Sequence, residues 1–234
     1  MKINAKAFTY RHGFAIRELI VVIVCLAVLS ILAFVGLRAF NERALRLRCQ
    51  NNLREVGGAM KAYGLAHDGL LPDCTPDNPR YGGAAWPWDI STNLFNELVR
   101  LGASTNSLYC PANPAMNDMY HREFWRFGHN SLQVISYGML FNGVQQEPPG
   151  LWRTNLAGDG VHSPAETELG FDATVSMNND FIHIRGLNVD RSNHVRGGKP
   201  LGGNILFEDG QVNWRDFKQM QRRIQTWPSA YWYF

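Results

Sequence analysis

The segment from Leu19 to Leu37 carries no charged residue and constrains the fold of this chain more than any other feature. Fourteen of its nineteen residues are Leu, Ile, Val or Phe. A helix needs about 20 apolar residues to cross the hydrocarbon core of a membrane. On an insertion scale, fourteen such residues favour the membrane by about 4–8 kcal/mol in sum. The segment therefore predicts a membrane-spanning helix.

The residues around this segment indicate how it is processed. A secretory signal peptide ends in an A-x-A-like cleavage site after a shorter apolar region, but Gly36-Leu37-Arg38 follows here. A processing site lies instead before the apolar run, at Gly13-Phe14, behind a short basic leader. Cleavage there would remove the leader and keep the helix.

This arrangement resembles the N-terminus of type IV pilins and type II secretion pseudopilins. In that family a prepilin peptidase cuts after the glycine, the new N-terminal Phe is N-methylated, and the fifth mature residue is a glutamate. Counted from Phe14, the fifth residue is Glu18. The resemblance implies that Glu18 pairs with the amine of Phe14 on the next subunit, because an unpaired carboxylate is costly in a low dielectric. That pair would set the register of stacked subunits.

Two residues depart from the family pattern and leave alternatives for Glu18. Ala15 replaces the usual threonine, and Arg17 replaces an apolar residue. Glu18 could simply end a membrane helix in headgroup water, where a charge costs less than at the helix centre. Arg17 could also neutralise Glu18 within the same chain.

The helix is predicted to continue beyond the membrane. One apolar stripe recurs at spacings of three and four, at Leu45, Cys49, Leu53, Val56, Met60 and Tyr63. Such a stripe is typical of an amphipathic helix that packs on a sheet. Gly57-Gly58 predicts close packing or a bend. Gly69 suits a C-terminal cap and Pro72 prevents continuation, so we expect one helix from about Ile16 to His67.

The chain then divides into four parts: a leader peptide 1–13, a transmembrane and filament-core helix 14–37, an amphipathic continuation 38–69 and a globular head 70–234. A length of 234 residues fits one globular domain plus an anchor. The expected fold class is α+β and pilin-like. In this fold the long N-terminal helix packs, through its amphipathic half, on an antiparallel β-sheet in the head.

Two elements of the head can be predicted from local patterns. Residues 204–208 and 211–214 flank Asp209-Gly210, a type I′ turn signal, and predict a β-hairpin. A short helix is predicted to be capped by Asp89 or Ser91 and stopped by Gly102. Its apolar face consists of Leu94, Leu98 and Leu101.

Further segments are similar to runs in certain pilin-like proteins of planctomycete, verrucomicrobial and lentisphaeral bacteria. These segments are Arg48–Gly57, Tyr63–Pro72, Leu108–Pro111, Ser136–Met139, Ser163–Ala173, Arg191–His194 and the hairpin at 204–214. The resemblance therefore extends over most of the chain, with the N-terminus and the hairpin as its specific parts.

Of the four cysteines, Cys25 lies in the apolar run and is expected to be a small apolar residue. Cys49, Cys74 and Cys110 are expected outside the membrane, where disulfides persist. They allow one bridge with three possible pairings, and the residues leave the pairing open. No CxxC or Cys/His cluster with zinc spacing appears in the sequence.

Evidence for a catalytic or ligand site is weak. His194 and Asp209 lack a nucleophile motif, so we expect Asp209 to make a turn and His194 to bind nearby backbone. No catalytic residue, metal site or cofactor is predicted. If the head binds an ion, calcium is the expected one, because four aspartates are placed in expected loops as oxygen donors: Asp159, Asp172, Asp180 and Asp190. The sequence contains no EF-hand loop.

The seven tryptophans suggest a second class of function. Trp86, Trp88, Trp152 and the tail 227–234 could form an exposed aromatic platform for a carbohydrate, whereas core packing is the simpler explanation. The tail, which ends in Tyr231-Trp232-Tyr233-Phe234, either docks on the head or exposes a patch for a partner.

The resemblance implies a structural protein rather than an enzyme. Its expected partners are the prepilin peptidase, other pilin or pseudopilin subunits and the inner membrane, which it would cross once with the head in the periplasm or on a surface filament. A net charge of +3 is too small to argue for nucleic acid. A type II secretion pseudopilus is the first expectation and a type IV pilus the second. The alternative is a monomeric, membrane-anchored extracytoplasmic binding module, for example for polysaccharide.

Overall fold

The computed structural model describes residues 16–72, 86–113, 132–141, 156, 162–184, 191–226 and 229–234. The predicted leader and the Gly13-Phe14 processing site lie outside these residues, as does Cys74. Contacts divide the chain into two units, Met1–Arg43 and Ala44–Phe234, and each is described by itself.

Helix α1 covers Ile16–Ala66 without interruption, close to the predicted range. The chain turns out of the helix at Asp68 and Gly69, which both have positive φ angles of 53° and 83°. The amide of Gly69 donates to the carbonyl of Gly64 at 2.7 Å, which satisfies one of the carbonyls left over at the helix end. Left-handed backbone therefore ends α1 where the sequence predicted a cap.

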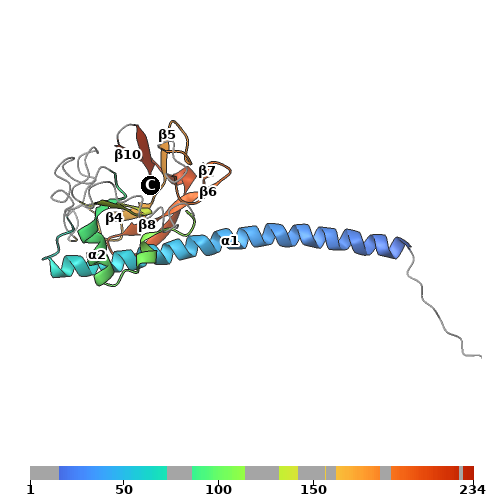
Figure 1. Cartoon of the computed structure of the whole chain (residues 1–234), viewed down its shortest axis with the longest axis horizontal. Coiled ribbons are helices and arrows are strands. Elements are labelled where there is room, and N and C mark those ends of the chain that lie inside the picture. Colours follow the sequence, from blue (N-terminus) through green and yellow to red (C-terminus); the bar gives the residue numbers. More distant parts are fainter. Residues whose placement is uncertain are drawn as a thin grey trace, which may run out of the picture. The chain divides into compact units, whose positions relative to one another are not determined.

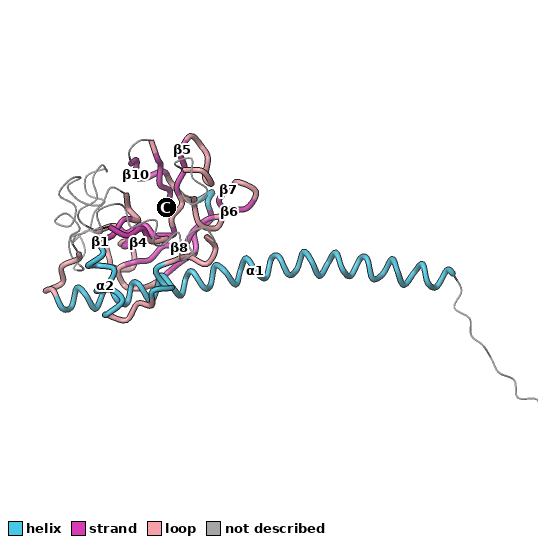
Figure 2. The backbone as a smooth tube through the Cα atoms, viewed as in Figure 1, coloured by secondary structure: helices cyan, strands magenta, loops and turns pink. Residues whose placement is uncertain are grey.

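The second unit is built from antiparallel sheets (Figures 1 and 2). Its central sheet has the strand order β3-β4-β8-β9, and a second sheet has the order β10-β11-β5. The central strands are β3 (Tyr137–Met139), β4 (Glu168–Asp172), β8 (Gly202–Phe207) and β9 (Val212–Asp216). The second sheet contains β5 (Val175–Met177), β10 (Arg222–Thr226) and β11 (Ala230–Tyr233).

Smaller elements complete this unit. The two-stranded pairs are β1 (Asp89–Ser91) with β2 (Leu132–Val134), and β6 (Val195–Arg196) with β7 (Lys199–Pro200). The short helices are α2 (Thr92–Arg100), η1 (Thr105–Leu108) and η2 (Phe217–Gln219).

The C-terminal half of α1 packs on the central sheet, so the predicted α+β class is confirmed. Cys49, Leu53, Val56 and Met60, four members of the predicted stripe, are fully buried. A Cβ atom added to Gly57 would lie 2.8 Å from Cδ1 of Leu206 in β8, whereas one added to Gly58 would meet nothing within 4 Å. The backbone of α1 therefore comes close to β8 at Gly57, and the close packing expected of the Gly-Gly pair is present.

The β8–β9 hairpin is present, but the predicted turn type is wrong. Phe207 and Gln211 close the loop through a bond from the Phe207 amide to the Gln211 carbonyl (2.8 Å), and the Gly210 amide donates back to Phe207 at 2.9 Å. A type I′ turn needs positive φ at both central residues, and only Gly210, at 92°, has it. The three-residue loop arises because the Asp209 carboxylate accepts a bond from the Gln211 amide at 2.8 Å, which holds Asp209 in ordinary backbone.

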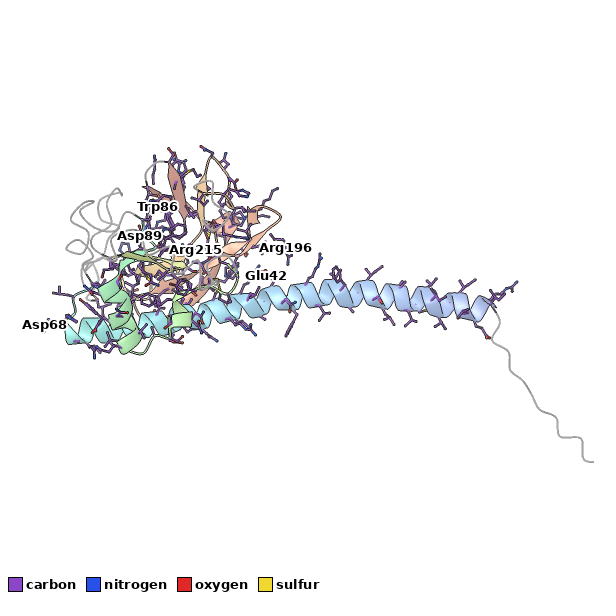
Figure 3. The ribbon with its side chains drawn as sticks, in the orientation of Figure 1. Glu42, Asp68, Trp86, Asp89, Arg196 and Arg215 are labelled. Carbon is purple, nitrogen blue, oxygen red and sulfur yellow. A yellow bond between two sulfur atoms is a disulfide. The ribbon has the colours of Figure 1, made fainter. Side chains whose placement is uncertain are left out.

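Helix α2 follows its predicted pattern. Ser91 is the N-cap, since its hydroxyl accepts a bond from the Leu94 amide at 3.0 Å. Asp89 instead accepts a bond from the amide of Trp86 at 3.0 Å, and Figure 3 shows the two residues close together. Gly102 follows the helix with a φ of 113°.

Three of the described tryptophans, Trp86, Trp88 and Trp232, form part of the core rather than an exposed platform. Trp86 and Trp88 stack with ring centroids 5.6 Å apart, and Trp232 meets Trp88 edge-on at 4.9 Å. All three side chains are buried. The C-terminal tail docks on the head, because β11 pairs with β10 and β5 and Phe234 stacks on Phe171 at 4.1 Å. Trp152 and Trp227 lie outside the described residues.

Candidate functional site

The outer surface of α1 is the first candidate site. Every described residue from Ile16 to Phe40 is exposed in the first unit, and the side chains point outward on all sides of the helix (Figure 3). The helix is long and apolar enough to cross a membrane, and none of its most apolar window is buried inside the protein. A soluble domain does not leave so large an apolar surface uncovered, so this half of α1 suggests a single-pass membrane anchor.

Glu18 is placed at the start of this surface. It lies in the first turn of α1, where a carboxylate is favoured by the helix dipole. Arg17 precedes it directly, and side chains at neighbouring positions of a helix do not face each other. This spacing argues against the alternative in which Arg17 neutralises Glu18 on the same chain.

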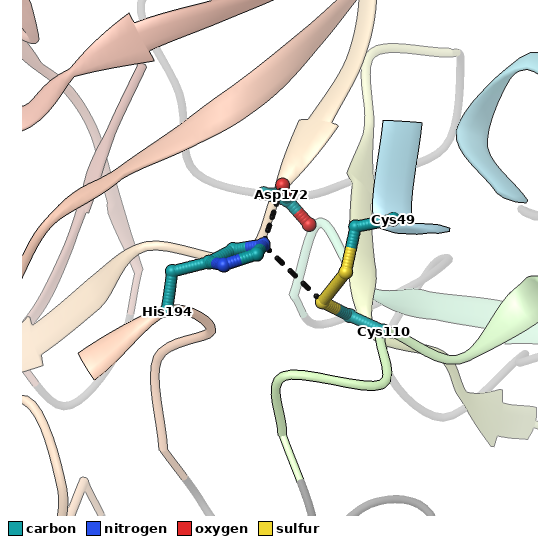
Figure 4. Close-up of side chains that lie close together, drawn as sticks. All are labelled: Cys49, Cys110, Asp172 and His194. Carbon is teal, nitrogen blue, oxygen red and sulfur yellow. Dashed lines mark hydrogen bonds and ion pairs between the residues drawn. A yellow bond between two sulfur atoms is a disulfide. The ribbon is translucent and has the colours of Figure 1, made fainter. Parts of the chain in front are cut away.

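The second candidate is a polar centre buried where α1 meets the sheet (Figure 4). Asp172, the last residue of β4, is fully buried. Its Oδ2 atom accepts bonds from the amide and from Nδ2 of Asn204, each at 2.8 Å. Its Oδ1 atom accepts a bond from Nδ2 of Asn193 at 3.0 Å, and Nε2 of His194 lies 3.4 Å from Oδ2. Several donors thus compensate the charge that burial would otherwise penalise.

A disulfide borders the same centre. It joins Cys49 of α1 to Cys110, which follows η1. The Cys110 Sγ atom lies 3.5 Å from Nε2 of His194. The structure therefore makes one of the three pairings that the sequence left open.

The His194 backbone is held in an unusual conformation. Its φ angle is 47°, in a left-handed region that histidine adopts more readily than most residues but that still costs energy. Asn193 next to it is fixed by a bond to the Ser136 carbonyl at 2.7 Å and accepts one from Asn113 at 3.2 Å. The ring of Trp214 meets the imidazole edge-on at 5.0 Å. These contacts aim the imidazole at both the carboxylate and the disulfide.

The buried carboxylate also affects its neighbour. Burial, and then the charge of Asp172, raise the pKa of the Tyr137 hydroxyl well above its usual range.

The predicted site residues fall into separate places. Asp209 makes the hairpin turn, as expected, and its carbonyl accepts a bond from Lys61. His194 was expected to bind a nearby backbone group. Its carbonyl accepts a bond from the Leu201 amide at 2.9 Å, while the Nε2 atom of its ring faces Asp172 and Cys110.

The expected loop donors for calcium also separate. Asp172 lies in a strand rather than a loop. Asp180 is partly exposed and accepts bonds from the Ile182 amide at 2.7 Å and from His183 at 2.9 Å. Asp159 and Asp190 lie outside the described residues.

The buried centre collects seven residues from six of the segments named above, with two of them from Arg191–His194. These residues are Cys49, Cys110, Ser136, Asp172, Asn193, His194 and Asn204. The sequence patterns identified these segments but did not indicate that they meet at one buried centre. The feature that these residues share in the sequence is a polar or cysteine side chain.

Comparison with models of protein families, with curated proteins and with solved structures finds no match to this chain. Its architecture, a long apolar N-terminal helix packed on an antiparallel sheet, is pilin-like.

Proposed function

We propose that this protein is a membrane-anchored, pilin-like filament subunit that a prepilin peptidase cuts after Gly13 and methylates at Phe14. The observation that carries the proposal is the continuity of α1. The same helix exposes an apolar surface from Ile16 onward and, from Cys49, buries one of its faces in the head.

This geometry supports assembly through the anchor half. Burial of apolar surface is worth about 25 cal/mol per Å². The exposed apolar surface of α1 would therefore be covered either by lipid or by equivalent helices of neighbouring subunits. A subunit could therefore leave the membrane for a filament by exchanging one apolar environment for the other. Glu18 would then fix the axial register by pairing with the liberated Phe14 amine of the next subunit, in a pseudopilus or a type IV pilus-like fibre.

The protein would have no catalytic activity and would reside in the inner membrane, with the head in the periplasm or on a surface filament. The alternative of an anchored carbohydrate-binding module loses support, since Trp86, Trp88 and Trp232 pack against one another inside the head. Glycan arrays with the full chain in detergent test that alternative directly, and a retained polysaccharide would revive it.

Processing is tested by mass spectrometry of the mature N-terminus in a host that carries a prepilin peptidase. We expect a chain that starts at N-methylated Phe14. A mature protein that keeps Met1, or one cut after Leu37 so that the helix is lost, contradicts the proposal.

Assembly is tested by the isosteric substitution Glu18→Gln, which removes the charge and keeps the size. We expect normal membrane insertion but at least a tenfold loss of the protein from sheared or periplasmic filaments, since an ion pair in low dielectric is strongly destabilised when one partner is lost. Glu42→Gln, a glutamate of the same helix beyond the apolar run, is the matched control and should assemble normally. Equal incorporation of both variants would favour the binding module.

A further inference from the structure

The polar centre of the head brings together four side chains that are all metal ligands. They are Cys49 and Cys110, Asp172 and His194, and all four are buried. One ligand atom from each lies within 4.8 Å of the ligand atoms of the other three. Figure 4 shows them converging from a helix, a strand and two loops.

We propose that these four residues form a tetrahedral site for a zinc-like divalent metal whenever the Cys49–Cys110 bond is reduced. The C-terminal half of α1 would then be held to the rest of the head in two alternative ways, by the disulfide to the Cys110 loop under oxidising conditions and by the shared metal under reducing ones. The proposal is independent of whether the protein assembles into a filament.

The spacing of the ligand atoms agrees with a tetrahedral site. Zinc binds nitrogen and oxygen at about 2.0–2.2 Å and sulfur at about 2.3 Å, so that tetrahedral N and O ligands lie about 3.4 Å apart and N and S ligands about 3.6 Å apart. The structure places His194 Nε2 3.4 Å from Asp172 Oδ2 and 3.5 Å from Cys110 Sγ. His194 is therefore already at a coordinating distance from two other ligands, and all four ligand atoms lie within 4.8 Å of one another. The two sulfur atoms must separate once their bond is reduced.

The surroundings also have the features of a supporting shell. Ligating carboxylates are commonly oriented by outer hydrogen bonds, and Asp172 accepts bonds from Asn193 and Asn204. The left-handed backbone of His194 is unusual for a fully buried side chain, and such conformations cluster at functional sites. Sulfur and imidazole ligands select zinc-like ions over calcium, which prefers oxygen ligands alone.

A dithiol reductant gives two electrons and two protons to the Cys49–Cys110 bond and becomes a disulfide itself. The metal then displaces the two thiol protons, because the thiolate is the ligand. Two thiolates, one carboxylate and a neutral imidazole around a dication leave a net charge of −1, which the amide donors to Asp172 help to stabilise.

The test uses the full chain in detergent, reduced and refolded without oxygen, and titrated with Co²⁺ as a spectroscopic probe that Zn²⁺ then displaces. We expect one Co²⁺ per chain, with a thiolate-to-cobalt charge-transfer band and intense d–d bands of tetrahedral geometry. The oxidised chain should show neither. A reduced wild-type chain that lacks the charge-transfer band overturns the proposal, and so does one that stays unfolded when metal is added.

The variant His194→Asn separates this site from adventitious cysteine binding, because asparagine tolerates the left-handed backbone that His194 adopts. Its Zn²⁺ affinity should fall at least about tenfold, the loss found even for residues that only support a ligand. His183→Asn, an exposed histidine beside Asp180, is the control and should bind as wild type does. Unchanged affinity in His194→Asn would refute the ligand set.

Discussion

Replacing Gly57 by alanine tests how closely α1 approaches the sheet. An alanine Cβ at this position would lie 2.8 Å from Cδ1 and 3.1 Å from Cδ2 of Leu206, so the fully buried Leu206 side chain would have to shift. Overpacking of this kind typically costs about 1–3 kcal/mol. Gly58, one residue further along the same helix, has nothing within 4 Å of its Cβ position and provides the matched control.

The pair of variants isolates the packing cost. Alanine is favoured over glycine in a helix interior by about 0.8–1.0 kcal/mol, and this gain applies equally at both positions. Gly58→Ala should therefore stabilise the head by about 1 kcal/mol. Gly57→Ala carries the same gain minus the overpacking, so the two variants should differ by about 1–3 kcal/mol.

The assay is thermal unfolding of the full chain in detergent, followed by the near-ultraviolet circular dichroism of the buried tryptophans. For a domain of this size, 1 kcal/mol shifts the midpoint by about 2–4 °C, so Gly57→Ala should melt about 2–12 °C below Gly58→Ala. Equal stabilisation by both substitutions would refute the close approach of α1 to β8.

Two further predictions concern the stability of the head. Loss of the disulfide in Cys110→Ser, with the metal absent, should destabilise the head by about 4 kcal/mol, since it releases a loop whose bridged ends are 61 positions apart in the sequence. Cys25→Ser should leave the stability of the head unchanged, and an equal effect of the two serine variants in urea unfolding would count against the bridge. The amide of Ile182 and then His183 lower the pKa of the Asp180 carboxyl, so its stabilising effect is present above the usual carboxyl pKa of about 3.9 and is lost as the pH falls through the lowered value. The stability difference between wild type and Asp180→Asn should accordingly be largest near neutral pH and shrink in acid, whereas a difference constant with pH would contradict this.

Helix α1 could be predicted almost to the residue because its signals are local. The charge-free run from Leu19 to Leu37 gives its first half, the three-and-four spacing of the stripe gives its second half, and Gly69 and Pro72 mark its end. Each signal depends on neighbours within a few positions. The hairpin was found for the same reason, although the side chain of Asp209 decided a turn type that the dipeptide alone does not specify.

The polar centre could not be predicted in this way. Cys49, Cys110, Asp172 and His194 are separated by roughly 20 to 60 residues in the sequence, and no spacing rule links a helix, a strand and two loops. The sequence predicted Asp172 to be an oxygen donor in a loop, because a single acid between Phe171 and Ala173 does not indicate whether its side chain is buried. Only the tertiary fold shows that β4 ends inside the protein, where Asn204 donates a hydrogen bond to the Asp172 carboxylate.

The dependence of α1 on β8 has a consequence for how the chain is made. The buried face of the helix, near Gly57, finds its partner Leu206 only after about 150 more residues have been synthesised. Contacts so distant in sequence form late and slow the folding of a domain. A nascent chain must therefore carry an uncovered helix face until the β8–β9 hairpin emerges. Truncation before Gly202 should leave a species that chaperones and proteases recognise at once.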